Sequence, residues 1–73
     1  MQEAALMAIE FREEGDVIRV LRGGVTAGQI FRVGVVHHFH KGHHVRQPLG
    51  HADFADENLE RLKATIRAKY ERR

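Results

Sequence analysis

The sequence predicts a small α+β domain: a three- to four-stranded antiparallel meander followed by one C-terminal amphipathic helix packed on the sheet. Apolar and polar residues alternate in short runs over about residues 7–40, as in half-buried strands. Near the C-terminus, four apolar residues recur at helical spacing: Leu59, Leu62, Ile66 and Tyr70. With 73 residues, the chain is expected to fold as a single domain, residues 1–73, with a loop over 41–52 and the helix over about 56–71.

The first two strands are predicted to form a β-hairpin. Polar and apolar residues alternate from about Ala8 to Arg12, which is the period of a strand. Gly15 stands in a turn signal, and the β-branched run 17–22 follows it, so the two runs are expected to pair. Three glycines over residues 23–28 then predict a loop that permits positive φ.

Gly34 interrupts the next apolar run, residues 29–40. This run is either one long strand with a bulge, or two strands that turn at the glycine. In the uninterrupted interpretation His37 faces one side of the sheet, whereas His38 and His40 face the other. A bend at Gly34 would shift this alternation, so the facing of the histidines depends on that turn.

The C-terminal helix has recognisable end signals. Asp53 or Asp56 is expected to cap its N-terminus, and Glu57 adds negative charge to its first turn. Lys69 stands in the last turn, where the helix dipole favours cations. One alternative architecture stays open, an SH3-like barrel with the helix appended, because the glycine-rich loop would suit a tight barrel. The open meander is preferred, since the loops are short enough for each strand to pair with the next.

The residue inventory excludes several classes of protein. The chain has no cysteine and no serine, which excludes disulfides, thiolate zinc sites and Ser–His or Cys–His catalysis. His51 and Asp53 are the nearest acid–base pair in sequence, and no enzyme is predicted. No apolar run approaches the ~20 residues of a membrane span, and there is no basic leader segment, so a cytoplasmic protein is expected. Arginine outnumbers lysine nine to three, which favours a GC-rich bacterial or phage source.

Charge is distributed unevenly along the chain. Residues 1–16 carry a net charge of −4, whereas residues 17–52 carry +5 and contain no acid. A basic segment of this kind favours an anionic partner. The first hypothesis is therefore a non-enzymatic accessory domain that contacts nucleic acid or another acidic partner. Five basic residues would supply charge, and two rings would supply shape and stacking: Arg19, Arg22, Arg32, Lys41, Arg46, Phe39 and His40.

The six histidines suggest a second hypothesis, a metal-binding protein. On a strand, His38 and His40 project from one face at a spacing that lets two imidazoles share a metal ion. His43 and His44 follow a Lys-Gly turn and could fold back as further ligands. Zinc is thus the cofactor that these residues permit, although no cofactor is expected.

A third hypothesis is a protein-interaction or self-assembly module. Apolar residues occur on both sides of the predicted strands, and one short helix offers too little surface to cover both faces of a sheet. The uncovered face would favour a second copy of the chain, related by a two-fold axis. A homodimer is compatible with nucleic-acid binding.

Overall fold

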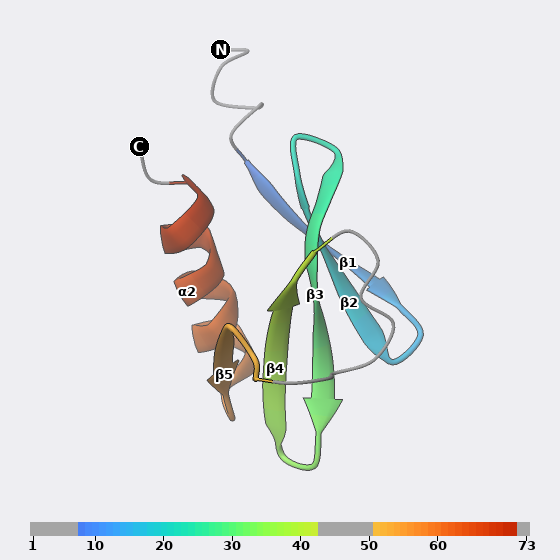
Figure 1. Cartoon of the computed structure of the whole chain (residues 1–73), viewed down its shortest axis with the longest axis vertical. Coiled ribbons are helices and arrows are strands. Elements are labelled where there is room, and N and C mark those ends of the chain that lie inside the picture. Colours follow the sequence, from blue (N-terminus) through green and yellow to red (C-terminus); the bar gives the residue numbers. More distant parts are fainter. Residues whose placement is uncertain (1–7, 43–50, 72–73) are drawn as a thin grey trace.

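A computed structural model of the protein describes residues 8–42 and 51–71, and within them an antiparallel sheet of five strands followed by one C-terminal helix (Figure 1). The elements in chain order are β1 (Ile9–Glu14), β2 (Val17–Arg22), β3 (Val25–Val33), β4 (Val36–Lys41), β5 (Phe54–Asp56) and α2 (Leu59–Glu71). The spatial order of the strands is also β1-β2-β3-β4-β5. The predicted α+β meander with a packed C-terminal helix is therefore confirmed, and it is preferred over the barrel because β1 and β5 remain at opposite edges.

The loop predicted over residues 23–28 is much shorter in the structure. Gly23 and Gly24 alone form the turn, with φ values of 60° and 84°, and β3 begins directly after them. Positive φ at both central residues matches the twist of a two-residue β-hairpin, and glycine adopts it without a steric penalty. The third glycine of the predicted loop, Gly28, instead lies within β3 and pairs with Val20.

The long apolar run is two strands, because the chain turns at Gly34, where φ is 66°. The turn changes the alternation expected for an uninterrupted strand. Ile30 pairs with Phe39, so both face the helix, whereas Phe31 pairs with His38 on the other side. Within β4 the predicted alternation holds, with His37 beside Phe39 on one side and His38 and His40 on the other, and the turn changes only which residues of β3 share those sides.

The core lies between the sheet and α2. Its buried members are Ile9, Val20, Ile30, Phe39, Leu62 and Ile66. Phe39 is fully buried; its ring stacks on Phe54, with centroids 6.0 Å apart, and meets Tyr70 edge-on at 6.2 Å. A Cβ atom at Gly28 would lie 2.5 Å from the Phe39 ring, so only glycine leaves room for it. The predicted helical stripe is thus the core face of α2.

Helix α2 also contacts β1, the strand at the opposite edge from β5. The Ile9 amide donates a hydrogen bond of 3.0 Å to the Glu71 carboxylate at the helix C-terminus. Lys63 and Arg67 lie over the Phe11 ring, 5.4 Å and 4.9 Å from its centroid. The helix therefore connects the two edge strands across one face of the sheet (Figure 1).

The helix begins at Leu59, three residues later than expected, and ends at Glu71 as expected. Asn58 is its N-cap: the Asn58 side-chain oxygen accepts a hydrogen bond of 3.0 Å from the Arg61 amide. Neither predicted cap is correct. Asp56 still belongs to β5, and the Asp53 carboxylate accepts a hydrogen bond of 2.8 Å from the Lys41 amide instead.

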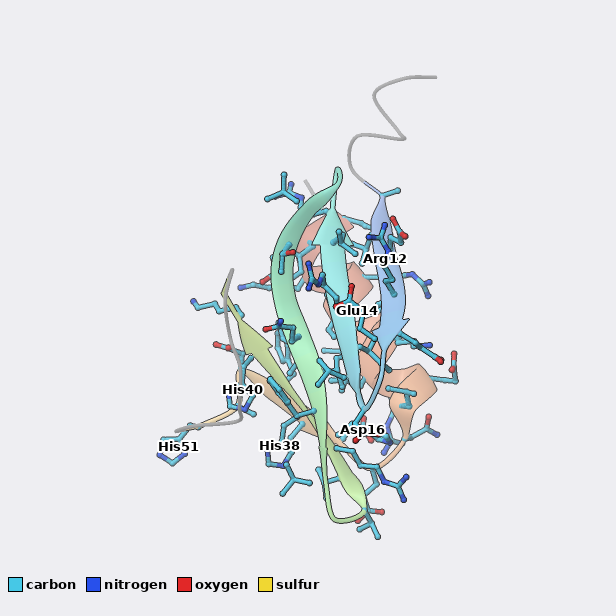
Figure 2. All side chains as sticks on the ribbon, turned by 90° about the vertical axis from the view of Figure 1, so that its right-hand side faces the viewer. Arg12, Glu14, Asp16, His38, His40 and His51 are labelled. Carbon is cyan, nitrogen blue, oxygen red and sulfur yellow. The ribbon has the colours of Figure 1, made fainter. Side chains whose placement is uncertain are left out.

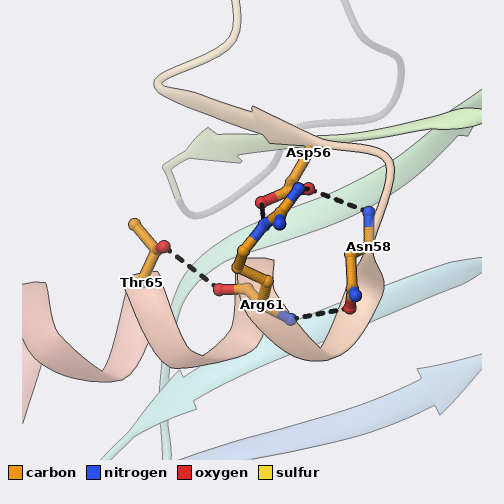
Figure 3. A network of polar contacts seen from close by, with 4 residues as sticks. All are labelled: Asp56, Asn58, Arg61 and Thr65. Atoms are coloured by element: carbon orange, nitrogen blue, oxygen red, sulfur yellow. Dashed lines mark hydrogen bonds and ion pairs between the residues drawn. The ribbon is translucent and has the colours of Figure 1, made fainter.

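Asp56 joins the end of β5 to the first turns of α2 (Figure 3). Its carboxylate accepts hydrogen bonds of 2.7 Å and 2.8 Å from the Arg61 guanidinium and one of 2.9 Å from the Asn58 amide. These contacts, with those to Arg61 the largest, lower the pKa of Asp56 to about 2. The same pair raises the pKa of Arg61. The Asp56 carboxylate thus holds the first turn of the helix against the end of β5.

The contact between Gly28 and Phe39 predicts that Gly28→Ala is strongly destabilising. The added methyl group would meet the Phe39 ring and the His40 carbonyl oxygen, so we expect a loss of about 3 kcal/mol in the free energy of unfolding, measured by urea denaturation. Gly15→Ala is the control, because φ there is positive but no atom lies near the added group; it should cost only about 1 kcal/mol. Equal losses for the two variants would contradict the packing described.

The low pKa of Asp56 predicts a loss of stability in acid. The ordinary pKa is 3.8 and the folded value is about 2, so between these values the unfolded chain binds more protons than the folded one. The contribution of Asp56 is present above about pH 4 and is lost as the pH falls through 2. In urea denaturation across this range, Asp56→Asn should flatten the pH dependence, whereas Asp16→Asn, in an exposed turn, should retain it. An unchanged slope in Asp56→Asn would refute the assignment.

Candidate functional site

The basic residues predicted to contact an anion do not form one surface. Arg22 and Lys41 end their strands and lie on the same side of the sheet as Tyr70 of α2. Arg19 lies on the opposite side, because it neighbours Val20 of the core. Arg32 lies toward the other end of β3. The fifth predicted residue, Arg46, is outside the described residues.

Arg22 and Lys41 line a cleft of about 580 Å³, here called the basic cleft. Residues from β2, β3, β4 and α2 form its wall, among them Arg22, Thr26, Lys41 and Tyr70. The strand register explains why these residues lie around one space. Strand β3 pairs with both β2 and β4, and so brings the ends of those two strands together. Two cationic residues and the phenol-bearing Tyr70 therefore line a single space.

Tyr70 is the cleft residue that sequence reasoning assigned only to the core. Its ring packs edge-on against Phe39, and the residue is half-buried. Burial raises the pKa of Tyr70, the Asp53 carboxylate raises it further, and Arg22 opposes both. The phenol therefore stays protonated at neutral pH and can donate a hydrogen bond to an anion.

Arg32 lies beside a second cavity of about 420 Å³ toward the other end of the sheet. The wall combines the carboxylates of Glu13 and Asp16 with Arg32 and His37, over the apolar side chains of Ile18 and Ile30. Charges of both signs meet there, so this end of the molecule is not a basic surface. The cation of Arg32 is separated from the basic cleft by the length of β3.

The sheet face turned away from α2 is here called the outer face (Figure 2). It carries Arg12 and Arg19, but each is paired with an acid on the same face. Arg12 contacts Glu10 at 3.0 Å, and Arg19 contacts Glu14 at 2.8 Å. The outer face is therefore electrically balanced, although the sequence placed Arg19 in a wholly basic segment.

The two rings predicted to supply stacking are both buried. Phe39 is 0% exposed in the core, and its ring faces away from solvent. His40 is 6% exposed and lies on the outer face, where its ring meets Phe31 edge-on at 5.8 Å. Neither ring offers a free face to a base in the structure described.

A row of three polar residues crosses the outer face. Arg19 pairs with Gln29, and Gln29 pairs with His40, so the three lie side by side on β2, β3 and β4. Each has one buried atom without a hydrogen-bond partner in the described part of the chain: the Arg19 Nε, the Gln29 Oε1 and the His40 Nε2. Sequence reasoning missed Gln29, because only the strand register reveals its position.

The histidines divide between the two faces. His38 and His40 share the outer face as predicted, with ring centroids 6.3 Å apart and planes inclined by 32° (Figure 2). His37 lies on the helix side, opposite Asp56. The other two predicted ligands, His43 and His44, are outside the described residues. Over residues 8–42 and 51–71, no three His, Cys, Asp or Glu side chains are grouped as they would be around a metal ion.

Two further findings bear on the class of protein. In the part of the chain that the structure describes, no helix is long and apolar enough to cross a membrane. Comparisons with known protein families, with curated proteins and with solved structures give no match. The roles of these residues are therefore inferred from the chemistry of the sites themselves.

Proposed function

We propose that the protein is a non-enzymatic binding domain that holds the phosphates of a nucleic acid in the basic cleft. The observation that carries the proposal is the meeting of the cationic residues Arg22 and Lys41 with Tyr70 around one space. Phosphate oxygens accept hydrogen bonds from these same donors in protein–nucleic acid complexes, and charged donors make the strongest of them.

The shape and lining of the cleft favour an extended anion over a simple ion. Its volume of about 580 Å³ exceeds what one phosphate needs, and Val25 and Ala27 add apolar surface beside the charges. A nucleic-acid strand supplies both parts, because its phosphates are anionic and its sugars and bases are largely apolar on their faces. Contacts to phosphate confer affinity without sequence preference.

The outer face supports this function less well than the cleft. Arg12 and Arg19 stand beside Glu10 and Glu14, so this face carries charges of both signs, and the carboxylates repel a phosphate backbone. The proposal therefore keeps Arg22 and Lys41 from the predicted contact set. It assigns no contact to Arg19, Arg32 or Phe39.

Self-assembly stays a prediction, and the exposed apolar residues of the described structure do not add support for it. Three apolar side chains are markedly exposed, Val25, Val33 and Val35. Val25 lies at the first residue of β3, whereas the other two flank the turn at Gly34 at its far end. They form no continuous patch of the size that marks a protein interface.

The proposal predicts that the protein binds single-stranded oligonucleotides and that substitutions in the cleft weaken the binding. In fluorescence anisotropy with a labelled oligonucleotide, Arg22→Gln and Lys41→Gln should each raise Kd about three- to tenfold. Each should also reduce the slope of log Kd against log salt concentration by about 1, because one phosphate contact is lost.

Arg12→Gln is the matched control, since it removes the same charge from the outer face. This side chain lies on the outer face and does not line the basic cleft, so its loss should leave both Kd and the salt slope nearly unchanged. The proposal fails if the wild-type protein shows no binding at low salt. It also fails if all three variants weaken binding equally, because the effect would then reflect net charge alone.

A further inference from the structure

We propose that His38 and His40, with the side-chain oxygen of Gln29, form a binding site for a divalent transition-metal ion of the zinc class. The site lies on the outer face, away from the basic cleft, and does not depend on the function proposed for that cleft. Three observations carry it: the spacing of the two imidazoles, the burial of His40, and two lone-pair atoms that lack partners.

The strand fixes the spacing of the imidazoles. Residues two apart on β4 project from the same face, and the two rings stand 6.3 Å apart between centroids at an inclination of 32°. Neighbouring imidazoles at this spacing can both direct a nitrogen toward one ion once the side chains rotate. Histidine nitrogens bind zinc at ~2.0–2.1 Å, which sets the approach that the two rings must make.

His40 is the buried member of the pair. The residue is only 6% exposed, yet its Nε2 has no hydrogen-bond partner in the described residues. A buried polar atom without a partner is destabilising, and its presence in a folded protein calls for a ligand or another role. Phe31 holds the ring edge-on at 5.8 Å, so the imidazole is already oriented by packing.

Gln29 supplies the third donor. It pairs directly with His40 across β3 and β4, and its Oε1 is likewise buried without a partner. A neutral imidazole with its proton on Nδ1 presents a lone pair at Nε2, as the amide does at Oε1. In this tautomer both unpartnered atoms are acceptors on paired residues, and one cation can satisfy both.

The donor set selects the class of ion. Two imidazoles and one amide oxygen suit zinc, copper or nickel, whereas magnesium and calcium prefer all-oxygen sites. The nearby cation of Arg19 would oppose a metal ion, but its ion pair with Glu14 at 2.8 Å offsets that charge. His38 is half-buried and forms the solvent side of the pair. A metal ion can therefore reach the site from solvent past His38.

The test is a zinc titration of protein produced without an affinity tag, followed by calorimetry and by the thermal midpoint. We expect one zinc ion per chain and a rise in the midpoint that EDTA reverses. His38→Ala should weaken zinc binding at least about tenfold. Because His38 is half-buried and His40 is buried, His38→Ala is the variant expected to fold, which its midpoint without zinc verifies.

His37→Ala is the matched control, because it lies on the same strand but on the helix side. It should bind zinc as the wild type does. Histidine-selective NMR adds a readout that stability alone would not move: zinc should shift the ring signals of His38 and His40 and leave those of His37 in place. The proposal is overturned if zinc leaves the wild-type midpoint unchanged. It is equally overturned if His38→Ala binds zinc as tightly as the wild type.

Discussion

The placement of the Phe39 ring beneath α2 is the contact on which the rest of the structure depends. The ring fills the space above Gly28, stacks on Phe54 and meets Tyr70 edge-on. It therefore joins β3, β4, β5 and the helix in a chain of 73 residues, which is near the lower size limit for a self-sufficient core. Because side chains on a strand alternate, fixing this one ring fixes the facing of every residue on β4.

That alternation separates the two sites. With Phe39 inward, Lys41 lies on the helix side at the end of β4 and faces the basic cleft with Tyr70. His38 and His40 fall on the outer face, next to Gln29 and Phe31. The burial of Phe39 under α2 thus places the basic cleft on one face of the sheet and the pair of histidines on the other. The acidic residues of β1 determine the charge of the outer face, because Glu10 and Glu14 form ion pairs with its arginines.

Much of the fold could be predicted because its signals are local. The hairpin at Gly15 follows from a turn signal between two β-rich runs, and α2 follows from the spacing of Leu62 and Ile66. Strand β5 could not be predicted, because three residues are too few to show an alternation. The N-cap was also misassigned: Asp56 has the right chemistry for a cap, but its pairing in β5 moves that role to Asn58.

The candidate sites were harder to predict, because they depend on which strand ends meet. Composition marked Arg22 and Arg32 alike as basic, but only the register places the first beside Lys41 and the second beside Glu13 and Asp16. The central claim is that the basic cleft binds nucleic acid, and amide shift mapping during an oligonucleotide titration tests it most directly. The account predicts that the largest changes occur at Arg22, Thr26, Lys41 and Gly42. Changes concentrated on the outer face, around Arg19 and His38, would contradict it.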